Sequence, residues 1–253
     1  KPVFLMPEND KSNKITLEGG DVMMVSPEHL VVGISERTSS AAAAQLTETL
    51  FQRGLVSKVS IVKIPAKRDY MHIDTIFTQV KKDVWVMMGL FSEQMNNHDH
   101  RSSIEKNLLG DEVEKAEIIQ FNKTMPHQPI HVSSLEALLR DISINDLGCK
   151  EVKIIFSGNN EYPYAVREQW TDSCNLLALK EGVVLSYDRN EKTIAAFVHA
   201  GFKVSKVQDL IQDLENDRIA VADIHDTVIV MPSAELSRAR GGFHCMSMPI
   251  NRD

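Results

Sequence analysis

The sequence is poor in cysteine and has no dense cluster of lysines and arginines. Its 253 residues include three cysteines, Cys149, Cys174 and Cys245. An odd and sparse set of this kind does not suit a disulfide framework, so we expect reduced thiols, one of them reactive. The 28 Lys and Arg residues are outnumbered by 35 Asp and Glu residues, giving a formal net charge of -7. A nucleic-acid surface needs many cationic side chains, so we expect no nucleic-acid partner.

Long apolar runs are missing as well. No run approaches the length that crosses a bilayer, and the stretch from Lys1 to Lys14 is charged where a secretion signal needs apolar residues. We therefore expect a soluble, cytoplasmic protein that does not bind membranes. Hydrophobic residues at 43% and charged residues at 25% are typical of a globular protein. Because no linker interrupts the chain, we expect one domain over residues 1–253.

Apolar periodicity and turn residues predict an α/β fold built from a repeated unit of strand, strand, helix and strand. In the first copy the helix is rich in alanine, with Thr38 or Ser39 as its N-cap and Gly54 as its stop signal. The elements of this copy are the strands Met23–Ser26 and His29–Ser35, the helix Ser39–Phe51 and the strand Val59–Ile64.

Two further copies follow along the chain, which indicates repeated units packed around a common axis. The second comprises the strands Met71–Val80 and Val84–Met88, the helix Ser134–Arg140 and the strand Val152–Phe156. The third comprises the strands Leu176–Leu179 and Val183–Tyr187, the helix Glu191–His199 and the strand Phe202–Ser205. The polar segment Gly89–Leu109 predicts a surface loop, and its His98 and His100 lack a carboxylate or cysteine at the spacing of a metal site.

Reactive side chains stand beside glycines or at expected strand ends in several separate segments. Each has a structural explanation when taken alone. His72 and Asp74 would share one face of a strand as a buried hydrogen-bonded pair, Glu18 would cap a turn, and Cys245 would be an inert small hydrophobe. Their joint occurrence favours chemistry, because a cysteine nucleophile needs a low thiol pKa or a nearby base, and a histidine can act as acid and then as base.

These segments together resemble the arginine deiminases of the guanidine-modifying superfamily. The matching residues are Glu18-Gly19-Gly20-Asp21, Gly33 to Ser39, His72 to Thr78, Arg167-Glu168-Gln169-Trp170 with Asp172 and Asn175, Tyr187 to Asn190, and Gly241-Gly242 through Met248-Pro249. The resemblance implies the pentein fold, a pseudosymmetric α/β propeller of five ββαβ repeats, of which about three are expected here.

The resemblance also implies a reaction and residue roles. The expected reaction is hydrolysis of L-arginine to citrulline and ammonia through a covalent cysteine amidino-thioether, without a cofactor or a metal ion. The implied catalytic residues are Cys245 as nucleophile, His72 as general acid and base, Asp74 as guanidinium-binding carboxylate and Glu18 as its partner. The implied substrate-binding residues are Arg37, Arg240, Asp74 and Gly242, the two arginines for the α-carboxylate. We also expect a homo-oligomer.

The chain departs from the family pattern in several places. The family's upstream sequence, which supplies a further guanidinium-binding aspartate, does not precede Lys1, so we expect a C-terminal part that depends on the missing repeats. The segment Gln208–Val230 is longer than the corresponding connection, and we expect it to be a surface elaboration. Cys174 replaces a small polar residue. The alternatives are a non-catalytic or partner-dependent guanidino-binding module, an amidinotransferase or a dimethylarginine hydrolase.

Overall fold

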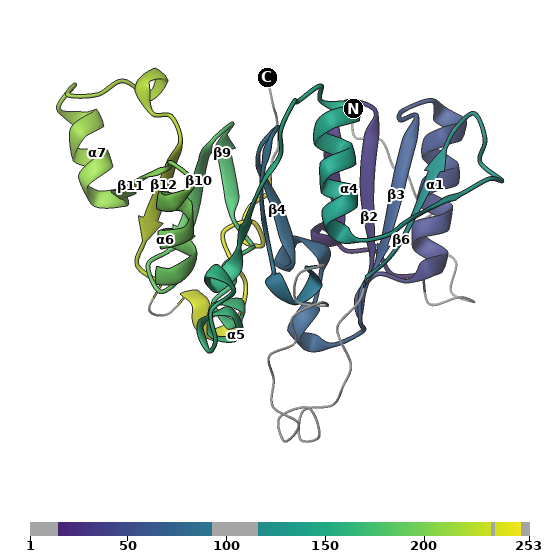
Figure 1. Ribbon diagram of the computed structural model, residues 1–253, viewed down its shortest axis with the longest axis horizontal. Coiled ribbons are helices and arrows are strands. Elements are labelled where there is room, and N and C mark those ends of the chain that lie inside the picture. The colour runs from purple at the N-terminus through teal and green to yellow at the C-terminus, as the bar shows by residue number, and fades with distance from the viewer. Residues whose placement is uncertain (1–14, 93–115, 234–235, 249–253) are drawn as a thin grey trace. The chain divides into compact units, whose positions relative to one another are not determined.

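The computed structural model describes residues 15–92, 116–233 and 236–248, which form a mixed α/β fold with open sheets (Figure 1). Its contacts divide the chain into two compact units, one with Lys1–Ile73 and Leu90–Leu147, the other with Asp74–Gly89 and Gly148–Asp253. The single domain expected over residues 1–253 stays a prediction. Within the described part of the chain, no helix is both long and apolar enough to span a membrane.

The first unit contains a five-stranded sheet in the order β1-β2-β3-β6-β7. Its strands are β1 (Val22–Ser26), β2 (His29–Ile34), β3 (Lys58–Lys63), β6 (Glu117–Asn122) and β7 (Ile130–Val132). Strands β1 and β2 are antiparallel. Helix α1 (Ser40–Arg53) connects β2 to β3, which runs parallel to β2. The hairpin, helix and strand predicted for the first copy are therefore confirmed, whereas β6 and β7 were not predicted.

Helix α1 has the ends that its sequence predicted. The Ser39 hydroxyl accepts the backbone N–H of Ala42, and Gly54 follows the helix with a φ of 66°, the left-handed conformation that glycine adopts without a Cβ clash. The buried face of α1 presents Leu46 and Leu50 to Leu30 and other apolar side chains of the sheet. This apolar interface accounts for one face of the sheet.

The opposite face of the same sheet is polar at its centre. His29 and Ser60, both fully buried, hydrogen-bond to each other at 2.8 Å, and His29 also lies 2.6 Å from Asp146. Asp146 ends the π-helical turn Ile142–Asp146 that follows α4 (Leu135–Asp141), so this helical segment covers the second face. The helix at Ser134–Arg140 is thus confirmed as a helix, but it belongs to the first unit, whereas the sheet of the second copy with which it was grouped belongs to the second unit.

The second unit contains two smaller sheets. One has the order β4-β5-β8 and the other the order β11-β12-β10-β9. Their strands are β4 (Phe77–Lys81), β5 (Val84–Met87), β8 (Lys153–Phe156), β9 (Leu177–Lys180), β10 (Val183–Tyr187), β11 (Lys203–Lys206) and β12 (Thr227–Met231). As in the first unit, an antiparallel pair is followed by a third strand parallel to its second member, β8 beside β5 and β12 beside β10.

Three predictions about these elements need correction. Residues 71–75 do not begin a strand, because Ile73–Thr75 is a 3-10 turn and the Ile73 N–H donates to the Asp21 side chain instead of to a strand neighbour. The third copy closes with β12, which lies between β10 and β11. Finally, Gly89–Phe91 is a 3-10 turn with Phe91 buried, while residues 93–109, including His98 and His100, lie outside the described residues.

The segment Gln208–Val230 is therefore more than a surface elaboration. It contains most of α7 (Val207–Glu215) and of the central strand β12. Leu210 of α7 packs against Val183 of β10 and Ile229 of β12, closing one face of this sheet. Helix α6 (Glu191–His199) is confirmed as predicted, and α5 (Tyr164–Trp170) lies in the same unit.

One buried carboxylate connects α5 to α6. Glu168 of α5 is fully buried and accepts hydrogen bonds from the backbone N–H groups of Lys192 and Thr193, each at 2.8 Å. The Thr193 hydroxyl donates to it as well, at 2.7 Å. The first turn of a helix has unpaired N–H groups and a positive dipole end, so an anion there is stabilised. Glu168 of the Arg-Glu-Gln-Trp segment thus has a structural role.

Candidate active site

Cys245 lies in a loop whose backbone is fixed by side chains from a different part of the second unit. The Cys245 N–H donates to Oδ1 of Asn175 at 3.0 Å, and the Gly241 N–H donates to Oδ2 of Asp172 at 2.8 Å. The hydroxyl of buried Tyr187 donates to the Gly241 carbonyl at 3.0 Å. Asp172 and Asn175, which had no predicted role, therefore position the loop that presents the exposed cysteine.

Gly242 is required by close packing. A Cβ at this residue would lie 2.4 Å from the backbone carbonyl oxygen of Asn175, much nearer than carbon and oxygen atoms can approach without bonding. The same Asn175 donates its amide N–H to the carbonyl of Asp74 at 3.3 Å. Gly242 was predicted to bind substrate, and the structure shows it packed on Asn175. The Asn175 side chain contacts both the cysteine loop and Asp74.

Asp74 brings a carboxylate to the cysteine. Its side chain is 1% exposed, with Oδ2 at 3.9 Å from Sγ of Cys245 and at 2.8 Å from Nδ1 of His244. Two of the predicted site residues, Asp74 and Cys245, are therefore adjacent within the second unit. His244 was not predicted, although it stands next to the cysteine in the segment that carried the resemblance, and its position there was the available signal.

Carboxylates of the second unit act on the cysteine thiol. The surrounding protein atoms and the carboxylate of Asp74 raise the pKa of Cys245 to about 12, and Asp172 adds to the effect. The hydrogen bonds from the Gly242 backbone and Asn175 lower this pKa only in part. A thiolate beside carboxylates is disfavoured, so these neighbours favour the protonated thiol.

Arg240 is paired with a buried carboxylate. Its Nη2 lies 3.4 Å from Oδ1 of Asp172, and the two side chains are 9% and 0% exposed. Burial raises the pKa of Asp172, and the charge of Arg240 opposes this rise. The pair therefore balances its own charge within the protein. Cys174, by contrast, is buried and its thiol pKa is raised mainly by burial, as expected for an inert thiol.

The first unit contains the other predicted catalytic residues. Nε2 of His72 lies 2.7 Å from Oε2 of Glu18, and the other carboxylate oxygen of Glu18 lies 3.9 Å from Nη1 of Arg37. The His72 side chain is 13% exposed, whereas those of Glu18 and Arg37 are 46% and 44% exposed. The structure thus joins three of the predicted residues, with the histidine hydrogen-bonded to a carboxylate that can orient its ring.

Asp21 holds the backbone next to the cluster of His72, Glu18 and Arg37 in place. Its carboxylate is fully buried and accepts hydrogen bonds from the Ser35 hydroxyl at 2.6 Å and from the Ile73 N–H at 3.0 Å. A Cβ at Gly33 would lie 2.3 Å from Oδ1 of Asp21, which explains the glycine there. Burial raises the pKa of Asp21 despite these bonds. The Glu-Gly-Gly-Asp and Gly33–Ser39 segments therefore anchor the residue that follows His72.

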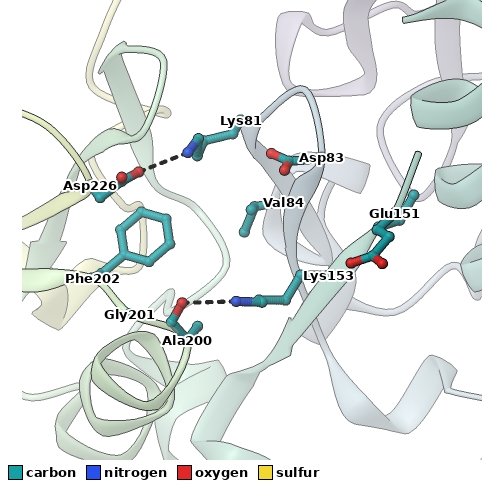
Figure 2. Close-up of a pocket in the computed structure, with 10 residues that line it drawn as sticks. Lys81, Asp83, Val84, Glu151, Lys153, Ala200, Gly201, Phe202 and Asp226 are labelled. Carbon is teal, nitrogen blue, oxygen red and sulfur yellow. Dashed lines mark hydrogen bonds and ion pairs between the residues drawn. The ribbon is translucent and has the colours of Figure 1, made fainter. Parts of the chain in front are cut away.

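A cavity of 370 Å³ in the second unit is not part of this chemistry. Figure 2 shows two lysines that project into it already bonded, Lys81 to Asp226 and Lys153 to the carbonyl of Ala200, each at 2.9 Å. None of the predicted site residues lines it. Among the residues that the structure describes, no three His, Cys, Asp or Glu side chains converge as a metal site.

The described residues define a class of α/β protein with a cysteine beside a carboxylate in one unit and a histidine beside a carboxylate in the other. The fold is similar to that of the amidinotransferase SxtG from Microseira wollei, with a TM-score of 0.53 and 15% identity, covering 96% of this chain and 49% of that one. This likeness concerns the fold alone.

Sequence comparison identifies the family. The family model for arginine deiminase matches residues 3–252, and the chain belongs to this family. The arginine deiminase of Borrelia garinii subsp. bavariensis is 33% identical over 239 residues, 94% of this chain and 47% of the relative. That of Staphylococcus haemolyticus is 30% identical over 254 residues, 100% of this chain and 50% of the relative. The chain thus spans about half the length of the curated relatives it matches.

Proposed function

We propose that the protein hydrolyses the guanidinium of L-arginine to citrulline and ammonia, with Cys245 as the nucleophile. The observation that supports this most is the exposed Cys245 thiol beside the buried Asp74 carboxylate, in a chain of the arginine deiminase family. A guanidinium is a planar cation with N–H donors in a fixed fork, and a carboxylate accepts two of them in parallel. Asp74 is the residue that would orient the guanidinium carbon toward sulfur.

The substrate itself would activate the nucleophile. Desolvation and Asp74 raise the pKa of Cys245 to about 12, so few thiolates exist in the ligand-free protein at neutral pH. A guanidinium bound at Asp74 neutralises that carboxylate and places positive charge next to Sγ. Both changes favour the thiolate, because an adjacent opposite charge lowers a thiol pKa. The protein therefore reacts with cationic ligands and spares neutral ones.

The bond changes then follow in two stages. The thiolate attacks the guanidinium carbon, and His72 protonates one terminal nitrogen, which leaves as ammonia and gives an amidino-thioether on Cys245. His72, now neutral, takes a proton from water, and the resulting hydroxide adds to the same carbon. Expulsion of the thiolate releases citrulline. Glu18, at 2.7 Å from His72, would keep the imidazole oriented through both proton transfers.

Arg37 and Arg240 would bind the α-carboxylate of the amino acid. A buried carboxylate needs cationic partners, and an arginine offers it two parallel hydrogen bonds. These contacts discriminate against agmatine, which has the same guanidinium but no carboxylate. Gly242, packed on Asn175, would leave room for the substrate backbone beside the cysteine. We also propose that the sheets belong to a five-repeat pentein propeller and that the protein forms a homo-oligomer.

The test is the product formed by the protein that carries this chain. We expect citrulline and ammonia from L-arginine, at least a hundredfold less product from agmatine (roughly 3 kcal/mol of lost binding), and no citrulline from Cys245→Ser. Cys149→Ser is the matched control, since Cys149 is the partly exposed cysteine outside the site. Transfer of the amidino group to an amine, or retained activity in Cys245→Ser, would contradict the proposal.

A further inference from the structure

We infer that Trp170 is a positioning residue that sets the orientation of the Arg240 guanidinium for a ligand carboxylate. The inference rests on the proposed function, in which Arg240 contacts the α-carboxylate of the substrate. It adds the residue that determines whether the carboxylate is recognised. The sequence singled out Trp170 within the Arg-Glu-Gln-Trp segment, and the proposed reaction gives it no other role.

The primary observation is a contact between Arg240 and Trp170 within the second unit. Cζ of Arg240 lies over the Trp170 ring, 4.7 Å from its centre, which is within the range of a cation–π interaction. The ring face therefore bounds the guanidinium on one side. A cation–π contact uses the charge of the guanidinium and does not replace the hydrogen bonds that a carboxylate would accept from its N–H groups.

The ion pair with Asp172 leaves room for a second contact to the guanidinium. The distance of 3.4 Å between Nη2 and Oδ1 exceeds the roughly 2.7–2.9 Å of a strong charge-assisted hydrogen bond. Asp172 makes a shorter hydrogen bond, at 2.8 Å, to the Gly241 N–H. Asp172 therefore balances the buried charge of Arg240, and the indole ring adds a contact that limits where the guanidinium can lie.

The backbone on both sides of this contact is in a rare conformation. Asp172 has a φ of 53° and Arg240 a φ of 69°, and neither is glycine. Residues with a Cβ seldom adopt the left-handed region, and such outliers cluster where a site requires a particular side-chain direction. Asp172 and Arg240 both have this backbone conformation, and their side chains form one ion pair. The backbone conformation therefore directs the two side chains toward each other.

The exposure of Trp170 fits a site more than a core. Its side chain is 47% exposed, whereas the other tryptophan, Trp85, is fully buried. Trp170 ends helix α5, which Glu168 anchors to α6 through three hydrogen bonds, so the ring is attached to a fixed element. The Trp170 ring has Arg240 over one face and is about half exposed to solvent. A ligand can therefore reach it.

The test compares Trp170→Leu with Tyr162→Leu, which removes the aromatic ring of a residue that is 84% exposed. In the protein that carries this chain, Trp170→Leu should raise the KM for L-arginine about five- to thirtyfold, as expected for loss of a cation–π contact. The kcat should change by less than about twofold, and the selectivity for L-arginine over agmatine should fall by the same factor as KM rises. Trp170→Phe should lie between wild type and Trp170→Leu.

A second readout does not depend on turnover. The chain has two tryptophans, so the emission of wild type minus that of Trp170→Phe reports the Trp170 ring. L-citrulline should change this difference signal, and a carbamoyl amine of the same length without the carboxylate should not. A citrulline response without citrulline formation from arginine would support the inference and contradict the proposed function. If the wild-type protein forms citrulline and Trp170→Leu has the same KM and selectivity, the inference alone is overturned. If L-citrulline leaves the difference emission unchanged and the wild-type protein has no activity, both the inference and the proposed function are overturned.

Discussion

At the scale of single residues, the decisive fact is that Cys245 faces carboxylates. A thiol beside Asp74 and Asp172 resists ionisation. Alkylation and oxidation both require the thiolate, so such a cysteine reacts slowly in either reaction. Under the proposed function, its reactivity would depend on a cationic ligand that occupies the space beside Asp74.

The first prediction concerns the thiol pKa. In Asp74→Asn, which keeps the shape of the side chain but removes its charge, the pKa of Cys245 should fall below the value of about 12 by roughly one unit. Burial remains, so the pKa should not reach that of a free thiol. The measurement is the ultraviolet absorbance of the thiolate against pH, as the difference between each protein and its Cys245→Ser counterpart. Asp209→Asn, an exposed aspartate on α7, is the control, and an equal shift in that variant would contradict the assignment.

The second prediction concerns Gly242. An alanine there places Cβ 2.4 Å from the carbonyl oxygen of Asn175, and a backbone atom cannot move aside as a flexible side chain can. Gly242→Ala should therefore lower the free energy of unfolding by about 1–3 kcal/mol and displace the cysteine. Gly19→Ala is the stability control, because a Cβ at Gly19 meets nothing within 4 Å. Denaturant unfolding of both variants measures the effect, and equal stabilities would show that the loop relaxes.

At the scale of elements, the sheet of the first unit has two unlike faces. Helix α1 covers one face with alanine and leucine side chains, whereas the segment from α4 to Asp146 covers the other through charged hydrogen bonds. Lys58 donates to Oδ1 of Asp146 at 2.5 Å, and His29 contacts Oδ2. The attachment of α4 therefore depends on the ionisation of a carboxylate, and that of α1 does not.

The third prediction follows from the sign of this dependence. Burial raises the pKa of Asp146, but the hydrogen bonds from His29 and Lys58 outweigh it and leave the pKa below its ordinary value. A carboxyl with a lowered folded pKa stabilises the protein above its unfolded pKa, about 3.9 for aspartate. This stabilisation is lost as pH falls through the lower folded pKa.

The measurement is denaturant unfolding of wild type and Asp146→Asn at several pH values. We expect a difference of about 1–3 kcal/mol near neutral pH, because Asn leaves the half-buried Lys58 with only its more distant carboxylate partner, Asp141 at 3.7 Å. The difference should shrink below about pH 4. Asp213→Asn removes the exposed Arg218–Asp213 pair, whose side chains are 66% and 45% exposed, and should have little effect at any pH. If the difference in unfolding free energy between wild type and Asp146→Asn grew as the pH fell, the predicted direction of the pH dependence would be wrong.

At the scale of the whole molecule, the described residues form two compact units, each with its own apolar cluster. Leu46 belongs to the cluster between α1 and its sheet, and Ile229 to the cluster between α7 and its sheet. Each unit is discontinuous in sequence, since Asp74–Gly89 joins the second unit before the chain returns to the first. His72 and Asp74 thus belong to different units although one residue separates them.

The fourth prediction uses this division. Leu46→Ala should destabilise the first unit by about 2–5 kcal/mol, as for other large-to-small changes in a core, and should accelerate amide hydrogen exchange in β2, β3 and α1. Exchange in β10 and β12 should change much less, because separate cores open in separate steps. Ile229→Ala should give the reciprocal pattern. If either variant accelerated exchange equally in both units, the molecule would open as one cooperative body.

Much of the local structure could be predicted because its causes are local. The Ser39 cap, the Gly54 stop and the short apolar runs of β2 and β10 act within a few residues, so α1, α6 and most strands appeared near their predicted ends. Residues 71–75 were predicted wrongly because the Ile73 N–H is bonded to Asp21, more than fifty positions away in the sequence. No local pattern reports such a bond.

The sequence by itself determined the family and the candidate reactive residues, because side-chain chemistry and motif order are written in the chain. Only the tertiary structure decided the electrostatics of the site. It brought Asp74 and Asp172 to Cys245, where they raise the thiol pKa, and it paired Arg240 with Asp172. It also placed β12 beside β10. The physical reason is that charges and strand neighbours act through space, and their distances arise when residues remote in sequence pack together.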